Sequence, residues 1–172
     1  MRDVLELGKA GTAGTGKGVR PVLRDAVVVA TLRASNWKEA ATAVVGNREW
    51  VLARAGRELI GREAHDPEGT ARLRARQTSW WKGTWDVDLE GTRVQVEPAS
   101  RWRGTHRYLV DGRVAAESGS SGGWWPRPTL RADGGLSLDH QVFLLWLELV
   151  IRGRDAAVLG GDGGGDGGGG GD

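Results

Sequence analysis

Short runs in which apolar and polar residues alternate follow one another along most of this chain, separated by turn residues at intervals of about ten. In one of the clearest, Trp85, Val87 and Leu89 alternate with polar residues, and the turn Glu90-Gly91 leads into a second alternating run. A period of two places apolar side chains on one face of a strand and polar ones on the other. The pattern therefore predicts antiparallel hairpins with one buried face.

Counting the alternating runs predicts about twelve strands. Their centres lie near Val4, Val22, Val28, Thr42, Val51, Leu59, Leu73, Val87, Val94, Tyr108, Val114 and Leu130. Residues 38–45 and 48–63 contain enough Ala, Glu and Leu to be helical by propensity alone. We favour strands there, because the turns Gly46-Asn47 and Ala55-Gly56 leave pieces too short for stable helices.

A short phrase recurs within the predicted hairpins. Trp81-Lys82-Gly83-Thr84-Trp85 returns 21 residues later as Trp102-Arg103-Gly104-Thr105-His106, and a weaker copy starts at Trp125. Trp37-Lys38 lies close to two such intervals before Trp81. A repeat of about 22 residues fits one hairpin, so the chain is expected to be a ring of similar hairpins.

The last predicted element is a helix over about residues 138–153, which Ser137 or Asp139 can cap and Gly153 is expected to end. Nearly every side of it is apolar, although Glu148 and Arg152 are spaced to pair with each other. A helix this apolar, and too short to cross a bilayer, belongs inside protein. It is therefore expected to fill the centre of the barrel.

The fold class that follows is mainly β: a closed antiparallel barrel of about twelve strands, built from hairpin repeats, with a buried hydrophobic C-terminal helix. Residues 1–19 are expected to form an N-terminal segment with a flexible Gly/Thr-rich part. Residues 20–157 would form the barrel with its central helix, and residues 158–172 a disordered Gly/Asp tail.

Composition narrows the function classes. The chain has no cysteine, which excludes disulfides, thiol chemistry and Cys-ligated metal sites and fits a reducing, cytoplasmic setting. Its net charge is +2, and three aspartates of the Gly/Asp tail conceal a more basic body, compatible with anionic lipid or nucleic acid. No transmembrane segment and no secretory signal are expected, since the longest apolar stretch, residues 142–151, contains Glu148.

Three phrases carry a resemblance to known proteins: Ser79-Trp80-Trp81, Trp102-Arg103-Gly104-Thr105-His106 and the run from Asp139 to Leu147. With them the chain resembles a group of uncharacterised, tryptophan-rich actinobacterial proteins, which implies no activity. More distantly, strand count and terminal helix are similar to the tubby C-terminal-like superfamily, which includes phospholipid scramblases and LURP-one-related proteins. That resemblance implies a closed twelve-stranded barrel around a hydrophobic helix, and no binding residue is carried over from it.

Enzyme-like patterns are few. Gly11 to Gly18 approximates a phosphate-binding loop, but Gly18 replaces the hydroxyl that would ligand Mg²⁺, and a flexible linker explains it better. His65, His106 and His140 lack the spacing of a metal or triad site, and surface or capping roles are expected for the last two. We therefore expect a non-enzymatic protein with no cofactor and no metal, with nucleotide binding through the Gly-rich loop as a remote alternative.

The best functional candidates are clusters of tryptophan and basic residues that each precede an equivalent strand. They supply the predicted ligand-binding residues, which are Trp81, Lys82, Arg101, Trp102, Arg103, Trp125 and Arg127. Such clusters can enter a membrane interface, anchor a protein partner or stack on bases. Alternatively the rings plug the barrel end beneath stacked arginines, and we favour this simpler interpretation because one ring of each Trp-Trp pair is expected to face inward.

The resulting functional hypothesis is a binding module for anionic membrane lipid or a protein partner, cytoplasmic or peripheral at the membrane. The alternative is a nucleic-acid-binding protein. For Glu148 on the buried helix, pairing with Arg152 or with an arginine of the barrel is expected.

Overall fold

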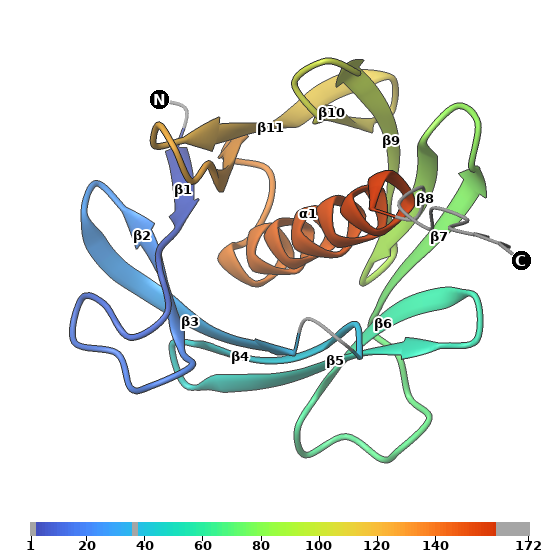
Figure 1. Ribbon diagram of the computed structural model, residues 1–172. Helices are drawn as coiled ribbons and strands as arrows, with labels where there is room; N and C mark the ends of the chain where they lie inside the picture. The colour runs from blue at the N-terminus through green and yellow to red at the C-terminus, as the bar shows by residue number, and fades with distance from the viewer. Residues whose placement is uncertain (1–2, 36–37, 161–172) are drawn as a thin grey trace, which may run out of the picture.

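The computed structural model describes residues 3–35 and 38–160. Twelve strands form one closed antiparallel barrel in which each strand pairs with its neighbours in sequence and β1 closes onto β12 (Figure 1). The strands are β1 (Asp3–Leu7), β2 (Arg20–Arg24), β3 (Val27–Ser35), β4 (Ala40–Val45), β5 (Arg48–Ala55), β6 (Glu58–Glu63), β7 (Leu73–Ser79), β8 (Thr84–Leu89), β9 (Thr92–Ser100), β10 (Thr105–Val110), β11 (Arg113–Ser121) and β12 (Arg127–Ala132).

Alternation in the sequence appears as alternation of burial in the barrel wall. In β8, Trp85, Val87 and Leu89 are buried while the residues between them face outward. Each of the twelve strand centres expected from the sequence lies inside its strand, and the two stretches with helical propensity form β4, β5 and β6. The fold class predicted from the sequence is thus confirmed, and the reason is that a period of two matches a wall with one dry face.

Tight turns at one end of the barrel depend on residues that tolerate positive φ. Asp111 and Gly112 both adopt it between β10 and β11, at 49° and 75°. Glu90 and Gly91 do the same between β8 and β9. Two successive left-handed residues match the twist of a two-residue hairpin, which explains the register of the flanking strands.

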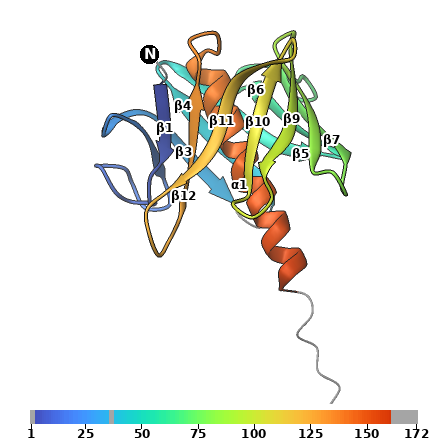
Figure 2. The ribbon, with the colours of Figure 1, turned by 90° about the horizontal axis from the view of Figure 1, so that it is seen from above.

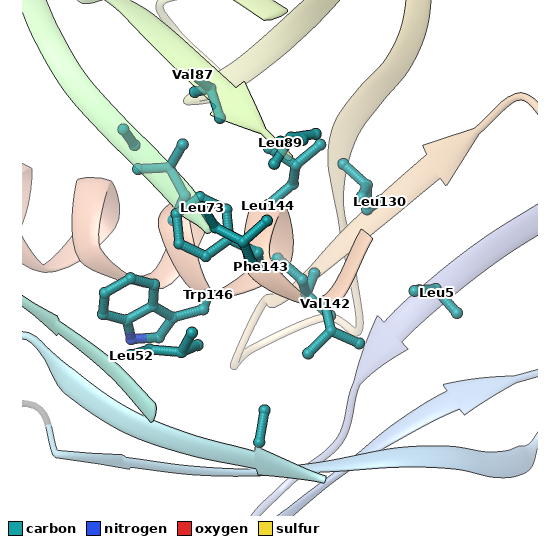
Figure 3. Close-up of a cluster of buried hydrophobic side chains, with 14 of the residues drawn as sticks. Leu5, Leu52, Leu73, Val87, Leu89, Leu130, Val142, Phe143, Leu144 and Trp146 are labelled. Atoms are coloured by element: carbon teal, nitrogen blue, oxygen red, sulfur yellow. The ribbon is translucent and has the colours of Figure 1, made fainter. Parts of the chain in front are cut away.

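The helix α1 (Leu138–Leu159) runs through the lumen of the barrel (Figure 1). Ser137 caps it and accepts the His140 backbone N–H at 3.3 Å. Phe143 and Trp146 lie in one cluster with side chains of the surrounding strands, such as Leu52 and Leu89 (Figure 3). Each large apolar side chain buried there stabilises the fold by roughly 2 kcal/mol, so this helix is the centre of the core.

The helix is longer than its sequence pattern suggests. It continues through Gly153 to Leu159, because its last turns leave the barrel and keep their backbone hydrogen bonds without needing a packed side-chain pattern (Figure 2). The strand β1, within the expected N-terminal segment, completes the barrel by pairing with both β2 and β12. The Gly-rich stretch that follows is the β1–β2 loop, and it leads into a strand rather than a helix.

Since all strand connections are between adjacent antiparallel strands, the loops alternate between two ends. The loops after β1, β3, β5, β7, β9 and β11 share one end, where α1 also emerges (Figure 2). We call it the tryptophan end, because its loops 80–83, 101–104 and 122–126 carry Trp80, Trp81, Trp102, Trp124 and Trp125. The remaining turns and the start of α1 form the opposite end.

Candidate functional site

The repeated phrase folds into the same loop twice. Ser79 Oγ accepts the Lys82 backbone N–H at 3.2 Å, and Ser100 Oγ accepts the Arg103 backbone N–H at 3.3 Å. The glycine that follows each cation is left-handed, with φ of 64° at Gly83 and 59° at Gly104. A serine bond across the turn and a glycine that reverses the chain present tryptophan and cation outward at the tip.

All five tryptophans of the tryptophan end are exposed to solvent. Their exposed fractions run from 62% at Trp80 to 100% at Trp102, and both rings of the Trp124-Trp125 pair exceed 80%. Trp80 and Trp81 pack edge to face on each other, with ring centroids 4.7 Å apart. The interpretation that these rings plug the barrel is therefore wrong, because the rings lie in solvent and the side chains of α1 fill the lumen. Trp37 lies outside the described residues.

The predicted cations of the site divide into two groups. Lys82, Arg101 and Arg103 are exposed at the loop tips and form no ion pair within residues 3–35 and 38–160. Arg127 differs, since its Nη2 lies 3.0 Å from Glu6 Oε1 on the neighbouring strand β1. The structure brings six of the seven predicted residues together on loops of one end, while Arg127 lies on the wall in an ion pair.

Charge is divided between the two ends of the barrel. The described loop residues of the tryptophan end include one carboxylate, Glu39, and seven exposed cations, namely Lys9, Lys17, Lys38, Arg57, Lys82, Arg101 and Arg103. Those of the opposite end include one cation, Arg72, and six carboxylates, namely Asp25, Asp66, Glu68, Glu90, Asp111 and Asp133. The loop residues therefore give the tryptophan end a net positive charge and the opposite end a net negative charge.

A buried polar cluster lies inside the barrel. Glu148 of α1 is fully buried, and its carboxylate bonds the Tyr108 hydroxyl and lies 3.0 Å from His106 Nδ1. Burial, together with the adjacent Glu148 carboxylate, raises the pKa of Tyr108 well above its ordinary value. The expected partner of Glu148, Arg152, instead donates to Gly119 O and Ser120 Oγ.

Two expectations from the sequence are thus wrong. Glu148 pairs with His106 and not with an arginine, and His106 is buried and does not lie at the surface. The alternation of residues in β10 could have predicted the burial of His106, because His106 and Tyr108 share the inward face of this strand. His140 does lie in the first helical turn and contacts Glu90 at 2.9 Å.

A charged network surrounds the start of α1 at the opposite end. Arg48 bonds Glu63 and lies 3.3 Å from Asp139, which also accepts the Trp50 indole N–H at 2.6 Å. The hydrogen bond from Arg48 lowers the pKa of Glu63. Arg72 forms a two-pronged pair with Asp66 at 2.7 Å and likewise lowers the pKa of that carboxyl. The network ties the helix start to the barrel rim.

At the tryptophan end a second ionic contact holds α1. Arg154 donates to both carboxylate oxygens of Glu39, at 2.6 and 2.9 Å, and stacks over Trp85. The hydrogen bond from Arg154, together with the positive charge of its guanidinium, lowers the pKa of Glu39. A cavity of about 330 Å³ beside them is lined by Trp146, Leu149 and Val150 of the helix. The contacts fix where the helix leaves the barrel.

Within residues 3–35 and 38–160, no group of three His, Asp or Glu side chains is placed to hold a metal ion. No helix in this part of the chain combines the length and apolar character needed to cross a membrane. Lys17, in the Gly-rich loop, is exposed to solvent.

No protein-family model, no curated protein and no solved structure matches this chain. The architecture therefore stands on the barrel itself, twelve antiparallel strands closed around a C-terminal helix.

Proposed function

We propose that this protein is a non-enzymatic module that binds anionic membrane surfaces through its tryptophan end, as a peripheral protein on the cytoplasmic side. The observation that carries the proposal is the exposure of five tryptophans on three neighbouring loops of one end. Exposed aromatic rings gathered in one region are unfavourable in water and mark an interaction surface. The likeness of the barrel and its helix to the tubby C-terminal-like fold is compatible with this role.

The chemistry of the loop tips fits a lipid interface better than an apolar protein groove. Tryptophan prefers the headgroup region of a bilayer, where its ring is buried and its indole N–H stays hydrated. Lys82, Arg101 and Arg103 alternate with the rings and are free to meet lipid phosphates. Each cation near an anionic surface contributes about 1 kcal/mol, so the loops supply both parts of a peripheral anchor.

Orientation follows from the division of charge. The tryptophan end carries the cations and the opposite end the carboxylates, so an anionic bilayer attracts one end and repels the other. The barrel axis would then stand across the membrane plane, with α1 pointing its C-terminal end toward the lipid. Three loops would enter the interface together, which multiplies their separate affinities.

Vesicle co-sedimentation tests this function directly. The protein should sediment with anionic vesicles at low salt and stay in solution with neutral ones, and its tryptophan emission should shift to the blue on binding. Trp81→Ala with Trp102→Ala should abolish the shift and weaken sedimentation. A double variant at the opposite end, Val27→Ala with Val114→Ala, removes exposed apolar side chains elsewhere and is the matched control. Full solubility of the wild type with anionic vesicles would contradict the proposal.

Titration with a single-stranded oligonucleotide under the same conditions tests the alternative function, nucleic-acid binding. Binding to the oligonucleotide with a steep salt dependence, and none to vesicles, would transfer the function to that alternative.

A further inference from the structure

Beside the tryptophan end, the pairing between β10 and β11 stops before the two strands end. Their ladder runs from Val110↔Arg113 to Arg107↔Glu117 and stops there. Beyond it, the last residues of β11 pair with β12 alone, and the hairpins β9–β10 and β11–β12 diverge (Figure 2). The His106 backbone N–H, which a continuous ladder would pair with a carbonyl, donates to Ser118 Oγ at 2.8 Å. A slot therefore separates the two hairpins.

This slot is a hollow of about 870 Å³ with a polar lining that includes two arginines and one carboxylate, Glu117. The lining groups that can bind an anion are Ser100, Arg103, Thr105, Arg107, Ser118 and Ser120. Arg103 has no ion pair within the described residues, and Arg107 has one contact, from Nε to Glu117 Oε1 at 3.5 Å. Each guanidinium is thus left with donors that can turn into the slot.

A third cation stands behind the serines. Arg152 of α1 donates from Nη2 to Gly119 O and Ser120 Oγ, two groups that line the slot. Its Nε is buried and has no hydrogen-bond partner within residues 3–35 and 38–160. Arg152 therefore adds positive charge behind the β11 side of the slot, where Glu117 is the one carboxylate among the lining residues.

The position of the slot relates it to the tryptophans. Trp102 lies in the loop on one side and Trp125 in the loop on the other, beside Pro126, which closes the rim. Along β10, Thr105 and Arg107 lie two residues apart, or about 7 Å, so the lining extends from the loop end into the strand.

We propose that the slot between β10 and β11 binds the phosphate monoester of a membrane lipid headgroup, with Arg103 and Arg107 on its oxygens and the serine and threonine hydroxyls as further donors. This inference rests on the proposed function and adds a selectivity to it. A monoester carries up to two charges and three free oxygens near neutral pH, whereas a diester carries one charge and two. Two arginine forks distinguish them, because guanidinium donors bind such oxygens in pairs.

The test compares vesicles containing phosphatidic acid, a monoester, with vesicles containing phosphatidylglycerol, a diester, at equal surface charge. The wild type should bind the phosphatidic acid vesicles about tenfold more tightly, the gain expected from one charge-assisted contact. Arg107→Gln should remove this preference, so that the two kinds of vesicle bind with equal affinity. Arg76→Gln, which removes an exposed wall arginine of β7, should keep the preference.

A second variant should change the preference for phosphatidic acid in the opposite direction. Glu117→Gln removes the carboxylate beside Arg107 and should raise the preference for phosphatidic acid at least about twofold. Soluble glycerol 3-phosphate should reduce phosphatidic acid binding to the level of phosphatidylglycerol. If the soluble monoester alone binds as tightly as the vesicles, a lipid occupant is overturned.

The failures of the two proposals are distinguishable. If the protein binds neither kind of vesicle, the proposed membrane function is wrong, and the proposal of a lipid ligand in the slot is wrong with it. Equal binding to both kinds, unaffected by Arg107→Gln and Glu117→Gln, would overturn the slot alone and leave the function standing.

Discussion

The carboxylate of Glu148, in the middle of α1, lies 3.0 Å from Nδ1 of His106 on β10. Both side chains are buried, and the Tyr108 hydroxyl donates to the same carboxylate. Taking a carboxylate out of water is costly, and two donors from one strand offset that cost. This contact fixes the rotation of α1 inside the barrel, since an apolar helix surface alone allows several orientations.

Removing the carboxylate should therefore destabilise the protein strongly. Glu148→Ala leaves two buried donors without an acceptor, and we expect the free energy of unfolding to fall by about 3–5 kcal/mol. Urea denaturation followed by circular dichroism measures it. As control, Glu117→Ala removes a surface pair with Arg107 and should cost no more than about 1 kcal/mol. Equal losses in the two variants would show that the buried contact stabilises nothing.

Acid should weaken the end of the barrel where α1 begins. Arg48 and Arg72 lower the pKa values of Glu63 and Asp66 in the folded state. The stability from these groups is complete above the ordinary carboxyl pKa of about 4, and it is lost as pH falls through the lower folded values. Unfolding by urea at a series of pH values below about 5 should thus show a decline.

The double variant Glu63→Gln with Asp66→Asn should flatten this decline and be less stable than the wild type at neutral pH. Glu68→Gln, at an exposed loop position, should follow the wild-type profile. A double variant with an unchanged slope would contradict the assignment of the acid sensitivity to these two ion pairs.

The exposed tryptophans should matter little for folding. Trp81→Ala and Trp102→Ala remove rings that contact solvent, and each should change the free energy of unfolding by less than about 0.5 kcal/mol. Trp146→Ala removes a ring from the core and should cost about 3–5 kcal/mol. Thermal unfolding distinguishes the two classes. A large loss at Trp102 would show that the loop ring packs on the barrel after all.

The Gly/Asp sequence beyond α1 should reduce the affinity for anionic vesicles. The helix α1 ends at the tryptophan end, and the sequence after it contains Asp162, Asp166 and Asp172, whose charges lower the net positive charge of the protein. Changing all three to asparagine should raise that affinity about threefold at low salt, and high salt should remove the gain. Co-sedimentation measures both conditions. An unchanged affinity at low salt would contradict this electrostatic effect.

Much of the candidate site was accessible from the sequence. The repeat of Trp81-Lys82-Gly83-Thr84 at Trp102 identified the loops. Two loops separated by an odd number of antiparallel strands lie at opposite ends of a barrel, and two loops separated by an even number lie at the same end. Their spacing by two strands places them at one end, which is what the barrel shows. Exposure of the rings could not be predicted, because it depends on whether α1 leaves room for them in the lumen.

The sequence by itself determined the strand positions and the turns, because these follow from local periods of two and from the φ preferences of residues such as Gly112. It also determined the buried helix, because nearly every side of that helix is apolar. Only the tertiary structure decided the partner of Glu148, the slot between β10 and β11 and the division of charge between the ends. Each of these joins residues far apart in the chain, such as His106 and Glu148, and closure of the barrel alone brings them into contact.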